Sequence, residues 1–195
     1  MKPSEFKRAA RYGSDVDLYG LFDLDERYDI DLSALEESYL SRSKQVHPDR
    51  FVNAPAADRV AALQRSMQLN DAYETIKRPL PRAEYLLVRN GVAIGDNEAL
   101  DPGFLMEVLE LREELQDARQ AGDTARLRTL EDAMLDRRDA AMERLAAAFA
   151  RLYDDRERDA LGVLKTEVIL LRYITRYLEE LDGALEELDG EPDGE

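Results

Sequence analysis

His47, Pro48 and Asp49 form a tripeptide whose residue types and order suit the recognition of a cation. Proline fixes its own φ and disfavours helical geometry in the residue before it, so we expect His47 to be extended in a rigid loop. Asp49 then presents an exposed carboxylate, which can accept two hydrogen bonds from one arginine. Loop chemistry alone equally allows a second interpretation, in which Asp49 only caps the segment that follows.

A catalytic or metal-binding role for His47 is disfavoured by the rest of the composition. His47 is the single histidine of the chain, and cysteine is absent. A metal site of several imidazoles or thiolates, a disulfide and a thiolate nucleophile are therefore all excluded. The sequence also has no glycine-rich phosphate loop and no paired nucleophile and base. We expect a binding protein without a cofactor, and not an enzyme.

A second group of residues with interaction chemistry lies on the helix expected over residues 104–121. At 3.6 residues per turn, its core stripe consists of Phe104, Val108, Leu111, Leu115 and Ala118. A second face, partly apolar and partly acidic, consists of Leu105, Met106, Leu109, Glu110, Glu113 and Asp117. Exposed leucine and methionine beside carboxylates indicate an interaction surface. The alternative is that this face packs under the N-terminal part of the chain, or is merely exposed to solvent.

Tyr173 shows a similar feature on the last predicted helix. The core stripe of that helix contains Leu164, Val168, Leu171 and Leu178, and the wheel places Tyr173 almost opposite to it. An aromatic ring there is either an interface anchor or an ordinary tyrosine with its ring along the surface.

Two helices must position the His-Pro-Asp loop. Periodicity is helical through nearly the whole chain and no convincing alternating run is present, so we expect an all-α protein. A helix over residues 32–46 must end at His47, because Pro48 cannot continue it. A second helix, after a polar loop, carries Val60, Leu63, Met67, Tyr73 and Ile76 on one side and ends at residues 78–81. We expect these two helices to form an antiparallel hairpin with the proline-bearing loop at its tip.

Three long amphipathic helices are expected in the C-terminal half, over residues 104–121, about 124–152 and about 156–188. Short loops between long helices are typical of antiparallel neighbours, and hence of a three-helix bundle. A glycine-, aspartate- and proline-rich stretch marks the boundary before the bundle. The expected segments are a flexible leader (1–15), the hairpin module (16–79), a short helix and connector (80–103), the bundle (104–188) and a disordered acidic tail (189–195).

The bulk composition restricts the partners and the compartment. A formal net charge of −16 would repel nucleic acids and anionic membrane surfaces. The acidity fits basic partner surfaces or a cytosol of high ionic strength, and does not choose between them. The first residues have no apolar segment of a secretory signal, and no stretch approaches the length of a membrane span. We expect a cytoplasmic monomer.

The helical hairpin, with Asn70-Asp71-Ala72-Tyr73 on its second helix, resembles a J-domain. The resemblance implies that the loop docks on a DnaK-type chaperone and promotes ATP hydrolysis by that partner. The residues implied in docking are His47, Pro48, Asp49, Arg42, Lys44 and Arg50. One departure is that J-domains usually carry a clearly basic helix before the loop, whereas here Glu36 and Glu37 balance the two cations of that helix.

Two further segments are similar to the HscB family of iron–sulfur cluster co-chaperones (Jac-type in mitochondria). Residues 80–87, Leu-Pro-Arg-Ala-Glu-Tyr-Leu-Leu, resemble the segment after its J-domain, and residues 104–115 resemble its client-binding helix. The resemblance covers roughly residues 16–188. It implies an HscA/DnaK-type ATPase chaperone and the scaffold protein IscU as partners. The implied client contacts are Leu105, Met106, Leu109, Glu110 and Glu113, with Asp117 and Tyr173 beside them.

Two positions depart from the family pattern, since Asp117 stands where a longer acid is typical and Tyr173 where phenylalanine is typical. Two other interpretations stay open. One is a general J-protein whose bundle recruits a different client, and the other is an acidic helical scaffold without a chaperone partner.

Overall fold

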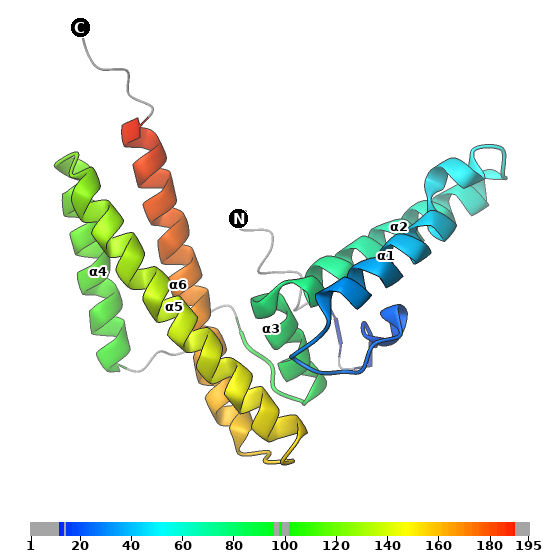
Figure 1. Cartoon of the computed structure of the whole chain (residues 1–195). Helices are drawn as coiled ribbons and strands as arrows, with labels where there is room; N and C mark the ends of the chain where they lie inside the picture. The colour runs from blue at the N-terminus through cyan, green and yellow to red at the C-terminus, as the bar shows by residue number, and fades with distance from the viewer. Residues whose placement is uncertain (1–11, 14, 96–97, 99–101, 190–195) are drawn as a thin grey trace, which may run out of the picture. The chain divides into compact units, whose positions relative to one another are not determined.

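A computed structural model of the chain describes residues 12–13, 15–95, 98 and 102–189 (Figure 1). These residues form helices and turns and contain no strand, so the all-α expectation is confirmed. The predicted leader lies almost wholly outside the described residues, and so does the predicted tail apart from Asp189, which ends the last helix. In the described part of the chain, no helix combines the length and the apolar character needed to cross a bilayer.

The chain divides into two compact units, which do not coincide with the predicted segment boundaries. Of the described residues, one unit contains 12–13, 15–93 and 148–164, and the other contains 94–95, 98, 102–147 and 165–189. The first unit therefore includes, besides the hairpin, the short helix after it and the end of the second bundle helix with the start of the third.

The hairpin consists of α1 (Leu32–Val46) and α2 (Ala56–Lys77), which lie side by side and antiparallel (Figure 1). Asp31 begins α1 as an N-cap, because its carboxylate accepts hydrogen bonds from the N–H groups of Ser33 (2.8 Å) and Ala34 (3.2 Å). The helix ends at Val46, as predicted from Pro48. A 3₁₀ turn, η3 (Pro48–Phe51), then leads toward α2.

The apolar stripe expected on the packed side of α2 is wrong for three of its five residues. Val60, Leu63 and Met67 are 50–58% exposed, whereas Tyr73 and Ile76 are buried. The buried face of α2 consists of Ala62, Leu69, Ala72, Tyr73, Thr75 and Ile76. The helix carries two apolar stripes, and the packed one contains two alanines, whose small side chains let the helices approach closely.

The next helix, α3 (Pro79–Arg89), is the short helix expected within residues 80–103, and it begins directly after α2. Its first turn includes Pro79 and Pro81, which helices tolerate at this end because the first N–H groups have no intrahelical partner. Leu80, Ala83 and residues 85–87 are buried, so α3 lies at the centre of its unit.

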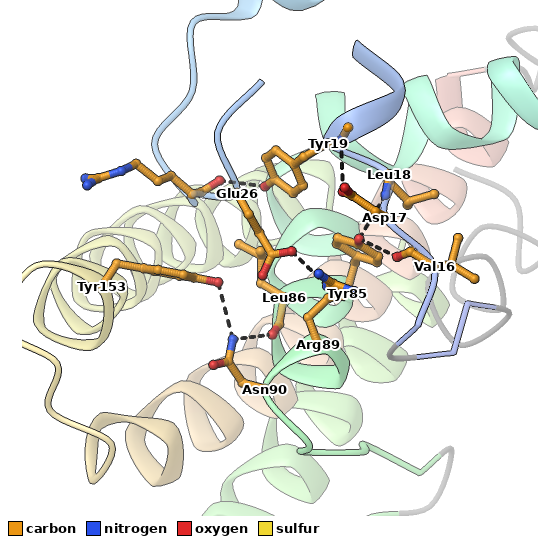
Figure 2. A network of polar contacts seen from close by, with 12 residues as sticks. Val16, Asp17, Leu18, Tyr19, Glu26, Tyr85, Leu86, Arg89, Asn90 and Tyr153 are labelled. Atoms are coloured by element: carbon orange, nitrogen blue, oxygen red, sulfur yellow. Dashed lines mark hydrogen bonds and ion pairs between the residues drawn. The ribbon is translucent and has the colours of Figure 1, made fainter. Parts of the chain in front are cut away.

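Tyr85 of α3 fastens the segment that precedes the hairpin (Figure 2). Its hydroxyl donates a hydrogen bond to the carbonyl oxygen of Val16 (2.7 Å) and accepts one from the N–H of Leu18 (3.0 Å). One turn later, Arg89 forms an ion pair with Glu26 (2.7 Å). Burial raises the pKa of Tyr85, so the phenol stays protonated and able to donate.

Residues 148–164 belong to this unit through aromatic and polar contacts. The ring of Phe149 stacks on that of Tyr28, with centroids 4.6 Å apart. Asn90 donates one hydrogen bond to the carbonyl oxygen of Leu86 (2.8 Å) and a longer one to the hydroxyl of Tyr153 (3.3 Å) (Figure 2).

The second unit is built on α4 (Pro102–Gln120) and on most of α5 (Thr124–Tyr153) and α6 (Ala160–Asp189). Gly122, with φ +63°, makes the left-handed turn after α4. The core of this unit consists of Leu115, Ala118, Leu127, Leu130, Met134, Ile174, Tyr177, Leu181 and Ala184. Arg112 pairs with Glu180 (3.3 Å) and Arg119 with Glu187 (2.5 Å), so α4 and α6 run parallel at a constant offset of 68 residues.

Candidate functional site

The His-Pro-Asp loop has the geometry expected from its sequence. The backbone of His47 is extended, with φ −58° and ψ 128°. The side chain of Asp49 is 85% exposed, and Nδ1 of His47 lies 3.6 Å from its Oδ2. The same Nδ1 accepts a long hydrogen bond from the N–H of Asp49 (3.3 Å). The carboxylate therefore faces solvent at the tip of the hairpin and is available to an external arginine.

The three cations implied in docking differ in their surroundings. Arg50 donates to the carbonyl oxygen of Lys44 (3.2 Å), in the last turn of α1, where a positive charge is favoured. Lys44 is exposed. Arg42 donates to the carboxylate of Asp23 (2.5 Å) and, through Nε, to the hydroxyl of Ser38 (3.4 Å). Among the described residues, Arg42 is thus the one of these three cations that pairs with a carboxylate.

The outer face of α4 is open, as predicted from the helical wheel. Leu105, Met106 and Leu109 are 46%, 59% and 49% exposed. The acidic residues predicted beside them, Glu110, Glu113 and Asp117, are exposed as well. Of the expected core stripe, Leu115 and Ala118 are buried, and Phe104, Val108 and Leu111 are half-buried. The helix therefore packs on one side and leaves an apolar and acidic face bare. We call this the outer face of α4.

Contacts on the packed side fix the rotation of α4. Glu107 accepts two hydrogen bonds from the guanidinium of Arg137 on α5, which also lies over the ring of Phe104, 5.8 Å from its centroid. The Arg137 hydrogen bonds hold the pKa of Glu107 below its ordinary value. On the other side, the hydroxyl of Tyr177 donates to the carbonyl oxygen of Leu111 (2.7 Å). These contacts hold Leu105, Met106 and Leu109 outward.

Tyr173 does not project away from the bundle as the helical wheel suggested. Its side chain is half-buried, and its ring meets that of Phe104 edge-on, with centroids 5.7 Å apart. It lines a narrow apolar cavity whose other residues are Phe104, Val108, Leu111, Arg112, Met134, Arg137, Ile174 and Tyr177. The helical-wheel prediction assumed one packed stripe on α6, whereas α6 packs on both α4 and α5. Tyr173 lies beside the first turn of α4, near the outer face and partly covered.

Sequence reasoning missed two groups around these surfaces. It did not identify the Glu107–Arg137 pair, although a glutamate beside an apolar stripe hints at a cationic partner on a neighbouring helix. It also gave no role to Asp23, which has a positive φ of 55°. A left-handed backbone at a residue other than glycine leaves no reliable mark in one sequence.

Comparison with known proteins connects these surfaces to a family. The family model of the HscB C-terminal oligomerisation domain matches residues 100–182. The co-chaperone protein HscB homolog of Aeromonas hydrophila is 38% identical over 172 residues, covering 86% of this chain and 95% of the relative. The homolog of Colwellia psychrerythraea is 43% identical over 110 residues, covering 55% of this chain and 63% of that relative. The solved structure of chaperone HscB from Vibrio cholerae matches with a TM-score of 0.74 and 31% identity, covering 89% of this chain and 99% of that one.

The similarity extends through both compact units, and the solved structure reproduces the order of helices. The relatives are named co-chaperones, which are not enzymes. A J-domain hairpin, an exposed His-Pro-Asp loop and the helical C-terminal part are therefore parts of one known architecture, and the chain belongs to the HscB family of co-chaperones.

Proposed function

We propose that this chain is a co-chaperone of iron–sulfur cluster assembly that connects an HscA/DnaK-type ATPase chaperone to an IscU-type scaffold protein. The J-domain loop and its cations, Arg42, Lys44 and Arg50, dock on the chaperone and stimulate its ATPase. The client is bound by Leu105, Met106, Leu109, Glu110, Glu113, Asp117 and Tyr173. The proposed compartment is the cytoplasm, as expected from the sequence. The chain itself carries out no reaction.

The observation that carries the proposal is the outer face of α4. Three apolar side chains of i, i+1, i+4 spacing are about half exposed on a helix whose opposite side supplies the core. Clustered exposed apolar residues rimmed by carboxylates favour a protein partner with a matching apolar patch and basic rim. Tyr173 is half-buried against Phe104, in the first turn of the same helix.

Coupling by tethering explains why one chain carries both surfaces. A client held on α4 stays near the chaperone that the loop engages, so its effective concentration there rises without any new contact. Docking of the loop then biases the chaperone toward its hydrolysed state, in which it holds the client. The two sites are thereby coupled through the conformational equilibrium of the partner.

Calorimetric titration of a purified IscU-type scaffold into the full chain tests the client half of the proposal. Leu105→Ala and Leu109→Ala are each expected to weaken binding by about 1–2 kcal/mol, as for truncation of interface anchors. Leu63→Ala is the matched control, since Leu63 on α2 is 50% exposed and lies outside the proposed client surface. Circular dichroism should show unchanged helicity for all three. Equal affinity of all variants, or no binding by the parent chain, contradicts the proposal.

A second use of the same face is suggested by the description of the family model, which names oligomerisation. Light scattering on the parent chain and on the two α4 variants separates the alternatives. A monomer at all concentrations supports client binding as the role of this face. A dimer that Leu109→Ala dissociates supports self-association instead.

A further inference from the structure

The ion pair between Asp23 and Arg42 joins the proposed docking face to the acidic segment that precedes it. Asp23 follows the short 3₁₀ helix η2 (Gly20–Phe22), and Arg42 lies on α1 nineteen residues later. The carboxylate is 81% exposed, and the arginine side chain is 34% exposed. The contact is therefore open to solvent and to a docking partner, and is not part of the hydrophobic core.

Asp23 adopts a backbone conformation that most side chains avoid. Its φ of 55° and ψ of 38° are left-handed, a region that glycine enters freely and that Asp and Asn tolerate at some cost. The turn itself needs only the backbone, because the N–H of Leu24 bonds to the carbonyl oxygen of Tyr19 (3.2 Å). Glycine would therefore make the same turn without strain. Asp23 therefore keeps a strained backbone while its carboxylate pairs with an arginine of the proposed docking face, which indicates a functional constraint at this position.

Arg42 differs in this respect from the other two cations of the docking face. Among the described residues, neither Lys44 nor Arg50 has a carboxylate partner, and Arg50 bonds only to a helix carbonyl. Arg42 forms an ion pair with Asp23, and its Nε donates a hydrogen bond to the hydroxyl of Ser38. A chaperone surface that attracts these cations must itself be acidic, so its carboxylates compete with Asp23 for the guanidinium of Arg42.

We infer that Asp23 restrains docking by competing with the chaperone for Arg42, which makes Asp23 a determinant of affinity on the J-domain. The inference rests on the proposed function, in which Arg42 takes part in docking. When the chaperone binds, its carboxylate displaces that of Asp23 from the guanidinium. No covalent step is involved, and the effect is confined to the strength of docking.

The test measures the half-maximal concentration, which is the concentration of the chain that gives half-maximal stimulation of a purified HscA/DnaK-type ATPase. Asp23→Asn removes the charge, keeps the side-chain shape and tolerates the left-handed backbone. Asp25→Asn is the matched control, because Asp25 is exposed in the same segment and changes the net charge equally. Asp23→Asn is expected to lower the half-maximal concentration about two- to fivefold relative to Asp25→Asn, the range of an exposed ion pair.

Two further variants make the result specific. Asp23→Gly relieves the backbone and removes the carboxylate, so it should lower the half-maximal concentration similarly. In an Arg42→Gln background, Asp23→Asn should have no further effect, because the pair is already broken. Equal half-maximal concentrations for Asp23→Asn and Asp25→Asn, or a higher one for Asp23→Asn, would overturn the inference. The proposed function would be unaffected by either result. A parent chain that stimulates no chaperone contradicts the proposed function, and the inference with it.

Discussion

Asp49 is the residue on which chaperone docking is proposed to depend most. Its carboxylate is 85% exposed, and Pro48 rigidifies the loop that presents it. The imidazole of His47 lies within 3.6 Å, yet leaves most of the carboxylate facing solvent. A bidentate arginine of the partner can therefore bind it without any rearrangement of the hairpin.

Asp49→Asn should abolish measurable stimulation of a DnaK-type ATPase and leave the affinity for IscU unchanged. The amide keeps the shape but loses the charge that strengthens the hydrogen bonds, a loss of about 1.5–3 kcal/mol. Phosphate release measures the stimulation of the ATPase, and calorimetry measures the affinity for IscU. Asp58→Asn, at an exposed aspartate in the first turn of α2, is the control and should behave as the parent. Full stimulation by Asp49→Asn would exclude this carboxylate from docking.

Residues whose role follows from local rules were predictable from the sequence, and residues that depend on distant partners were not. The exposure of Asp49 follows from Pro48, and that of Leu109 from helical periodicity. The Asp23–Arg42 pair depends on the path of a turn nineteen residues away. The covered position of Tyr173 depends on the side from which α4 approaches α6.

At the scale of elements, α4 is held by polar contacts on both flanks. Arg137 of α5 binds Glu107 through two hydrogen bonds, and two arginines of α4 pair with glutamates of α6. Exposed pairs contribute little each, but the Glu107–Arg137 pair is partly buried and bidentate. It is the polar contact most suited to fix the orientation of the helix.

The stability contributed by this pair should disappear in acid. The folded state lowers the pKa of Glu107, so the contribution is complete above the unfolded pKa of about 4.3 and is lost as pH falls through the lower, folded value. The melting temperature of Glu107→Gln should therefore lie below that of the parent near neutral pH, and the gap should close in acid. Glu110→Gln, on the outer face, should show no such closing gap. A gap that stays constant down to about pH 3 would exclude the mechanism.

Element type and approximate bounds were predictable, because proline, glycine and helical periodicity act locally. Which of two apolar stripes on α2 packs was not, because that choice depends on the shape of α1. The alanines of the packed face allow a close approach that the larger Val60, Leu63 and Met67 do not. The compact units also differ from the predicted segments, since the Tyr28–Phe149 stack joins residues distant in sequence.

At the scale of the whole molecule, the dominant physical property is a net charge of −16 on 195 residues. Repulsion among like charges opposes the compact state, and dissolved salt screens it. The arginine–carboxylate pairs act in the opposite direction, but most are exposed and individually weak. We therefore expect repulsion to dominate the response to salt.

The melting temperature of the chain should rise with sodium chloride, as the screening length falls from about 30 Å at 0.01 M to about 8 Å at 0.15 M. Scanning calorimetry across this range measures the shift. Chloride is preferable to sulfate, because sulfate stabilises most folded proteins by exclusion from their surfaces. A melting temperature that falls with added chloride would mean that the ion pairs outweigh the repulsion.

The separation of the packed stripe and the outer face on α4 has a consequence for how the sequence of such a protein can change. Leu105, Met106 and Leu109 contribute little to the core, so substitutions there should change the proposed client binding at almost no cost in folding free energy. Under the proposed function, only the client constrains which residues stand at these three positions, whereas the fold constrains the opposite stripe. A change of client would then need only a few replacements on one helix, and the packed residues of the bundle could stay unchanged.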